Sequence, residues 1–207
     1  MSAVEKAAQS TALPAIGKAY GGGFVTGITR DQVTGNRYLN ITASAKHELA
    51  GTWGECGAKI EGADSFTNSR ANTEAMASAG SELAKQVLGL EIGGFTDWAI
   101  PARDVQELQY RHFKPTTEQN WAGRRDGDNP HSEPVGLLYS EEDPKQTVHE
   151  AFQAGGTEAF RDTWYWSSSQ RSAFNAFYVG FVDGYQDHYG KGLELRVRPV
   201  RSELLID

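Results

Sequence analysis

The chain of 207 residues has one cysteine, Cys56, and no long apolar run. A single thiol excludes an intramolecular disulfide, two-cysteine redox chemistry and a thiolate-rich metal site. No stretch is long and apolar enough to span a bilayer, so we expect no membrane insertion. The first residues also lack a basic region followed by an apolar one, so we expect no secretory signal and synthesis in a reducing cytosol.

Positive charge is scarce as well, since 20 Lys and Arg residues face 27 Asp and Glu residues and the formal net charge is -7. Nucleic-acid phosphates repel such a chain on average, so we expect no nucleic-acid partner. The five histidines stand at positions 47, 112, 131, 149 and 188. None pairs with another histidine or with cysteine at the spacing of metal ligands. We therefore predict no metal site and no cofactor.

One acidic segment is similar to part of a calcium-binding loop. It contains Asp126, Asp128 and Asn129, but Leu137 occupies the twelfth position of the segment. A calcium loop needs a glutamate at that position. We therefore expect these side chains to be polar groups of a surface turn.

Catalytic motifs are also missing. Ser167, Ser168 and Ser169 follow aromatic residues and have no Gly-x-Ser-x-Gly elbow around them. We expect their hydroxyls to satisfy neighbouring backbone groups. Glu141 and Glu142 lie in a polar loop that gives no sign of a desolvated acid. The sequence thus predicts no catalytic residues and a protein that is not an enzyme.

The length favours one domain. Residues 1–19 carry a weak helical stripe that breaks at Pro14. Two interpretations of this segment stay open, a frayed terminus and an arm for attachment to another protein. Residues 20–207 form the predicted domain.

Alternating residues predict strands near both ends of the domain. A hairpin joins Phe24–Thr29 to Arg37–Ala43. Further strands are expected at Trp164–Ser168, Ala176–Phe181 and Leu193–Val200, the last with alternating apolar and charged residues.

Helical spacing predicts two helices. The first runs over Ala71–Leu88, is weakened at Gly80 and begins with Asn72 or Thr73 as its cap. The second runs over Ala102–Phe113. Between this helix and the late strands, residues 114–163 have few regular signals beyond a short helix over residues 147–152. So long a loop in a compact domain is typically either functional or a packed surface loop.

Aromatic residues gather between positions 164 and 189. Trp166, Phe177 and Phe181 are expected in the core. Tyr185–Tyr189 lies between two glycines and combines aromatic and polar side chains. It is either a binding loop, because such residues offer contact area at low entropic cost, or an ordinary exposed hairpin tip.

Three sequence boxes resemble those of a known domain family. They lie at Gly93–Leu108, which includes Asp97-Trp98-Ala99-Ile100-Pro101, at Tyr165–Ser169, and at Val197–Arg201. In this order they are similar to the C-type-lectin-like domain family of phage tail-fibre proteins and of the C-terminal domain of a bacterial collagen-like adhesin. The resemblance covers roughly residues 20–202.

This resemblance implies an α+β fold of the C-type-lectin-like class, in the variant shared with formylglycine-generating enzymes. Two helices would flank a small, twisted antiparallel sheet with long loops. In phage relatives the late segment contacts the receptor, which places the ligand-binding surface between residues 174 and 189. The candidate ligand-binding residues are Phe174, Asn175, Tyr178, Tyr185, Gln186, Asp187, His188 and Tyr189.

The sequence departs from two related activities. Formylglycine-generating enzymes use paired cysteines, whereas this chain has only Cys56. Calcium-dependent lectins use Glu-Pro-Asn and Trp-Asn-Asp, but here Glu133-Pro134 is followed by Val135, and no Trp-Asn-Asp exists. Calcium-dependent sugar binding is therefore not expected.

Within the boxes, four residues are expected to serve the scaffold. Trp98 and Pro101 precede the second helix and would fix its entry. Arg198 and Arg201 would bridge loop carbonyls or carboxylates.

The resemblance implies a phage tail or tail-fibre tip protein that binds a bacterial surface receptor, protein or glycan, without catalysis. Such a protein would be located in the virion, contact other tail proteins and form a homotrimer. Two alternatives remain: a structural virion component such as a baseplate or decoration protein, and an enzyme on a formylglycine-generating-enzyme-like fold.

Overall fold

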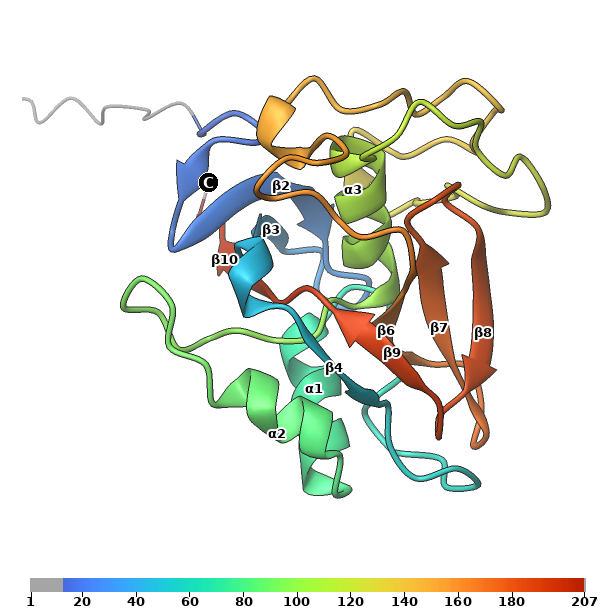
Figure 1. Ribbon diagram of the computed structural model, residues 1–207. Coiled ribbons are helices and arrows are strands. Elements are labelled where there is room, and N and C mark those ends of the chain that lie inside the picture. Colours follow the sequence, from blue (N-terminus) through green and yellow to red (C-terminus); the bar gives the residue numbers. More distant parts are fainter. Residues whose placement is uncertain (1–12, 207) are drawn as a thin grey trace, which may run out of the picture.

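The hairpin predicted near residues 24–43 forms the centre of the first sheet, sheet A, in the computed structural model, which describes residues 13–206 (Figure 1). Every strand pair in this sheet is antiparallel. Its strands are β1 (Ala19–Tyr20), β2 (Gly23–Arg30), β3 (Arg37–Thr42), β5 (Ser132–Glu133) and β10 (Val200–Leu204).

The second sheet, sheet B, has the order β4-β9-β6-β7-β8. Its neighbours are antiparallel except for β6 and β9, which run parallel where Tyr165 lies opposite Arg196. The strands are β4 (Leu49–Thr52), β6 (Trp164–Gln170), β7 (Asn175–Gly180), β8 (Gln186–Gly190) and β9 (Glu194–Val197). The prediction of one strand over Leu193–Val200 is wrong, because the chain leaves sheet B after Val197 and enters sheet A at Val200.

The predicted helix over Ala71–Leu88 is two helices, α1 (Ser69–Ser78) and α2 (Glu82–Leu88). Gly80 separates them with a φ of +99°, a left-handed conformation that ends a helix and that glycine adopts without strain. Ser81 then caps α2, its hydroxyl accepting a hydrogen bond from the backbone of Ala84. The cap of α1 is Asn68, and the predicted caps Asn72 and Thr73 lie inside the helix.

The second predicted helix is α3 (Arg103–Phe113), which begins and ends within one residue of the prediction. Two short 3-10 helices, η1 (Ala45–His47) and η2 (Glu150–Phe152), complete the elements of residues 13–206. The chain thus has an α+β fold with three α-helices and two sheets in its described part. The expectation of two helices around one small antiparallel sheet is wrong, because the described residues form three α-helices and two sheets.

Helix α3 lies between the two sheets (Figure 1). Its faces are buried nearly all round, including the polar residues Gln106 and Gln109. Gln106 Nε2 donates to the carbonyl oxygens of Tyr165 and Trp166 in β6, at 2.8 Å each. Gln109 Nε2 donates to Thr42 Oγ1 in β3 at 3.1 Å. The helix is therefore hydrogen-bonded to both sheets as well as packed against them.

A buried ion pair stands where the chain changes sheets. Arg198 Nη2 lies 2.6 Å from Glu48 Oε1, and both side chains are almost completely buried. The guanidinium also donates to the carbonyl oxygens of Glu158 and Ala159 and lies over the ring of Phe160. The bridging role predicted for Arg198 is confirmed.

The other scaffold residues behave similarly. Trp98 is fully buried, and its Nε1 donates to Phe95 O at 3.0 Å. Arg201 lies 2.8 Å from Asp97 and 3.2 Å from Glu203. These contacts fix the segment that leads into α3 against β10.

The first twelve residues of the predicted terminal segment 1–19 lie outside the described residues. Its last residues join the domain, since Gly17 N donates to Val25 O at 2.8 Å and Val25 N donates to Lys18 O at 2.9 Å. Ile16 packs against the aromatic core next to α3.

We predict that Arg198→Met lowers the free energy of unfolding by about 3–5 kcal/mol, because it leaves the buried Glu48 carboxylate without its main partner. Urea denaturation with linear extrapolation measures this loss. The matched control is Arg161→Met, since Arg161 is 66% exposed and only 3.5 Å from the same carboxylate; its cost should be below about 1 kcal/mol. Equal losses in the two variants would contradict a central role for Arg198.

Candidate binding site at the edge of sheet B

The predicted binding loop Tyr185–Tyr189 is mostly a strand. Gln186–Gly190 forms β8, the edge strand of sheet B, and pairs with β7 so that Tyr178 lies opposite Asp187 and Phe177 opposite His188. The connecting turn is residues 181–185, where Gly184 has a φ of +75°. The prediction of a loop is wrong because the second flanking glycine, Gly190, ends a strand rather than a turn.

The eight predicted ligand-binding residues do not form one surface. Adjacent residues of a strand point to opposite faces, so Tyr178, Asp187 and Tyr189 lie on one face of the hairpin, called the outer face here. Tyr178 is only 5% exposed on this face and belongs to the core, so the prediction that it contacts a ligand directly does not fit its burial. Gln186 and His188 lie on the inner face, which is turned toward α3. The position of Gln186 Nε2, 3.3 Å from Tyr139 OH, supports this assignment.

Phe174 and Asn175 lie at the far end of the hairpin from Tyr185. Asn175 pairs with Gly190, and Phe174 is exposed beside Cys56, whose Sγ is 3.8 Å from Phe174 O. The length of the strands therefore separates these two residues from Tyr185 and Gln186, whereas Tyr189 pairs with Ala176 at their end of the hairpin.

On the outer face, five aromatic side chains follow one another and are called the aromatic row here. Trp121 contacts Tyr185 edge-on, with ring centroids 5.4 Å apart. Tyr185 and Tyr178 are 6.3 Å apart, and Tyr178 stacks on Trp164 at 4.9 Å. Trp164 in turn meets Tyr189 edge-on at 5.5 Å. Three predicted site residues thus join two tryptophans that the sequence did not mark as site residues.

Charged and polar groups border the aromatic row. Asp187 Oδ2 accepts hydrogen bonds from Tyr185 OH at 2.7 Å and Arg124 Nη1 at 3.0 Å. Burial alone would raise the pKa of Asp187, but the hydrogen bonds from Tyr185 and from the His188 backbone outweigh it and lower the pKa. The Asp187 carboxylate is thus ionised at neutral pH and holds the Tyr185 ring in place.

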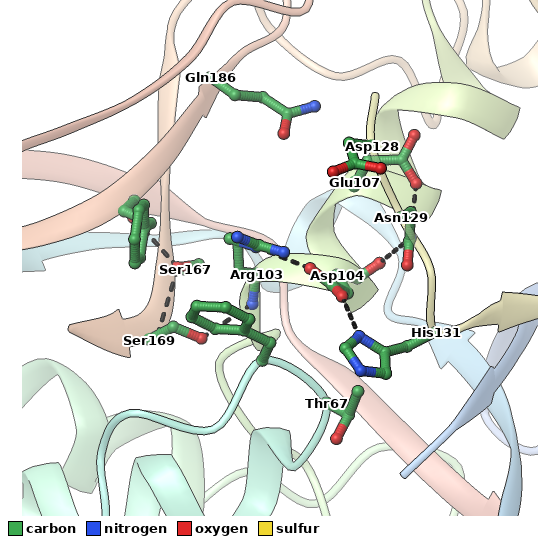
Figure 2. A network of polar contacts seen from close by, with 12 residues as sticks. Thr67, Arg103, Asp104, Glu107, Asp128, Asn129, His131, Ser167, Ser169 and Gln186 are labelled. Carbon is green, nitrogen blue, oxygen red and sulfur yellow. Dashed lines mark hydrogen bonds and ion pairs between the residues drawn. The ribbon is translucent and has the colours of Figure 1, made fainter. Parts of the chain in front are cut away.

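The inner face leads to a polar network around the start of α3 (Figure 2). Arg103 lies over the ring of Phe66 at 3.7 Å and donates to Asp104 Oδ1 at 2.7 Å. The second oxygen of the buried Asp104 is 2.6 Å from His131 Nδ1. The carboxylate therefore orients the imidazole of His131.

An Asp–His pair is also part of hydrolytic sites, so its neighbours matter. Thr67 lies beside His131 in Figure 2. Its hydroxyl donates to Asp31 Oδ2 at 3.0 Å and accepts from Gln32 N at 3.2 Å. The Thr67 hydroxyl donates its hydrogen bond to Asp31 and not to His131. The Asp104–His131 pair therefore does not activate Thr67 as a nucleophile in this arrangement.

The late serines have structural contacts. Ser167 Oγ donates to Phe177 O at 3.1 Å, and Ser169 Oγ donates to Ser65 O at 2.6 Å. The prediction that these hydroxyls satisfy backbone groups is confirmed for Ser167 and Ser169, whereas Ser168 Oγ accepts from the side chain of Asn72 at 3.3 Å.

The segment predicted as a surface turn is partly buried. Asn129 is fully buried, and its Nδ2 donates to Glu107 Oε2 at 2.7 Å. Glu107 also accepts from Tyr139 OH and pairs with Arg111. Burial raises the pKa of Glu107 despite these partners. The prediction of surface positions is wrong because α3 brings buried polar partners to this turn.

Asp126 ties this turn to the edge strand. Its Oδ1 accepts from Gln186 N at 2.7 Å, at the first residue of β8. Its Oδ2 is buried and has no partner among residues 13–206, and the residue is only 3% exposed. This burial raises the pKa of Asp126 to about 6.

Two further properties concern the described residues as a whole. No group of three or more His, Cys, Asp or Glu side chains in residues 13–206 has an arrangement that could hold a metal ion. None of the helices in this part of the chain has the length and apolar character needed to cross a bilayer.

No model of a known protein family matches the chain, and no curated protein matches it either.

We predict that Asp126→Asn changes the pH dependence of stability. The pKa of Asp126 rises from about 3.9 in the unfolded chain to about 6 in the fold. The folded chain therefore binds more protons between these values, and the wild type loses stability as pH rises through them. Relative to the variant, the wild type should lose on the order of 2 kcal/mol between pH 4 and pH 7.

Denaturant unfolding at several pH values measures this difference. Asp162→Asn is the control, because Asp162 is exposed. A difference between wild type and Asp126→Asn that stays constant with pH would show that Asp126 keeps an ordinary pKa.

Proposed function

We propose that this protein is a non-catalytic receptor-binding protein of a bacteriophage tail, which contacts a bacterial surface structure through the β7–β8 edge of sheet B. The observation that carries this proposal is the aromatic row. Trp121 is 50% exposed, Tyr189 44% and Trp164 40%, and the three belong to one continuous set of rings. Exposed aromatic side chains gathered on one face mark binding surfaces.

The same region is held in place before any ligand arrives. Asp126 fixes the start of β8, and Asp187 fixes the ring of Tyr185. Tyr and Trp lose little entropy on binding, and a rigid support reduces the cost further. The outer face is therefore suited to binding rather than to packing alone.

The sequence boxes support the family assignment on which the virion role rests. Trp98, Ser167 and Arg198 are all buried. Residues of the boxes thus serve the scaffold, while the surface between positions 174 and 189 carries the residues that would vary with the receptor. A C-type-lectin-like fold, a homotrimer and contacts with other tail proteins belong to this proposal.

The alternative of a structural virion component predicts a different role for the same surface. In that case the aromatic row would be covered by a neighbouring subunit and would have no affinity for cells. Cell binding distinguishes the two functions.

We predict that the purified protein binds saturably to cells of its host within a panel of candidate bacteria. The variant Tyr185→Ala/His188→Ala/Tyr189→Ala should bind at least about 10-fold more weakly, as expected for the loss of central aromatic contacts. Labelled protein titrated against intact cells measures the affinity, and circular dichroism checks that the variant is folded.

The control is Val33→Ala/Val148→Ala, which changes two exposed residues outside sheet B and should bind normally. Single variants then locate the contact, since Tyr189 lies on the outer face and His188 on the inner face. Folded wild-type protein that binds no cell of the panel would favour the structural virion component.

A further inference from the structure

The five tryptophans of the chain fall into two groups. Trp53, Trp98 and Trp166 are fully buried. Each donates its indole N–H to a backbone carbonyl oxygen, of Ser167 at 2.8 Å, Phe95 at 3.0 Å and Gly51 at 3.3 Å respectively. Buried indoles normally find such a partner, so these three belong to the scaffold.

Trp121 and Trp164 are different. Both are largely exposed, and neither indole Nε1 has a hydrogen-bond partner within residues 13–206. Each therefore presents part of its ring surface to solvent and keeps an indole N–H without a partner among these residues. Two such side chains in the aromatic row are more than the scaffold requires.

Two hollows both have Trp121 and Asp183 in their lining. The first has a volume of about 350 Å³ and also contains Trp164 and Tyr185 in its lining. The second has a volume of about 410 Å³ and is lined further by Gln119 and Glu141. These volumes fall at the lower end of the range of small-molecule sites.

Hydrogen bonds to neighbouring segments hold the loop that carries Trp121. Trp121 N donates to Asp183 O at 2.8 Å, and Asn120 N donates to Glu141 O at 2.9 Å. The buried Asn120 side chain also accepts from Tyr110 OH at 2.7 Å and from Lys114 Nζ at 2.8 Å. The backbone that carries Trp121 is thus fixed by contacts within the protein.

The charge around the hollows selects against anions. Glu141 and Asp183 line them, and Asp187 lies next to Tyr185. Arg124 is the cation that pairs with Asp187, which leaves the two other carboxylates in excess. Phosphate, sulfate or sialic-acid groups would be repelled at this place.

We propose that these two hollows bind consecutive units of a neutral or amino-sugar glycan, with Trp121 and Trp164 as the stacking surfaces; this inference rests on the proposed receptor-binding function. The C–H face of a pyranose carries partial positive charge and suits the negative face of an indole. Its hydroxyl groups donate to Asp183 and Glu141 and accept from the indole N–H groups. A chain of sugars, with alternating apolar faces and hydroxyl edges, matches this arrangement of groups.

The test uses an array of purified bacterial polysaccharides that includes neutral, amino-sugar and acidic members. The full-length wild type should bind neutral or amino-sugar members in preference to acidic ones. Trp121→Ala and Trp164→Ala should each weaken this binding at least about 10-fold. The matched control is Tyr20→Ala, an exposed aromatic residue on sheet A, which should leave binding unchanged.

The conservative variants Trp121→Phe and Trp164→Phe test whether the alanine variants lose binding because they misfold. Each keeps a ring and should restore part of the binding that alanine removes. Absence of array binding by the folded wild type, binding to acidic members only, or binding that survives both alanine changes overturns the inference.

Cells separate this inference from the proposed function. If cells bind the protein and periodate oxidation of their surface sugars abolishes binding, the glycan inference and the receptor-binding function both stand. If protease treatment abolishes binding and periodate does not, the receptor is a protein, and the glycan inference fails while the function holds. If cells do not bind but the array does in a tryptophan-dependent way, the glycan site stands and the receptor-binding function fails.

Discussion

The buried ion pair of Arg198 with Glu48 is the contact on which the arrangement of the two sheets depends. Arg198 stands between β9 of sheet B and β10 of sheet A, and Glu48 stands between β3 of sheet A and β4 of sheet B. The chain passes from one sheet to the other at both residues. One ion pair therefore joins the β3–β4 connection to the β9–β10 connection. Because a buried charge without its partner is costly, the charges of both residues are satisfied only when the two crossings lie side by side.

Polar contacts also run from the two ends of this region to α3 and to the β7–β8 edge of sheet B. Gln109 Nε2 donates to Arg198 O at 3.1 Å, and two residues earlier in the helix Glu107 accepts from Tyr139 OH. Tyr139 OH is in turn 3.3 Å from Gln186 Nε2 at the start of β8. Unsatisfied buried polar groups cost free energy, so these contacts favour one arrangement of the elements around α3. The crossing at Arg198 and the start of the edge strand are therefore both tied to α3.

The sequence predicts those parts of the fold that depend on local periodicity. The β2–β3 hairpin and α3 appear where alternation and helical spacing place them. The division of the helix at Gly80 could have been predicted from the sequence, because a glycine that ends one helix is followed by a serine that can cap the next. The burial of Asp126 and Asn129 was not, since their partners come from α3 and β8, far away in the chain.

The aromatic row shows the same limit for the site. Trp121 comes from a loop, Trp164 from the start of β6, and the three tyrosines from the β7–β8 hairpin, so no spacing in the sequence relates them. Nor does the sequence tell an exposed tryptophan from a buried one, because burial depends on these long-range contacts. What separates the two classes is the indole N–H, which is bound to backbone in the buried tryptophans and has no partner among residues 13–206 in Trp121 and Trp164. The hydrogen bonds that hold the two sheets together therefore do not depend on these two exposed side chains.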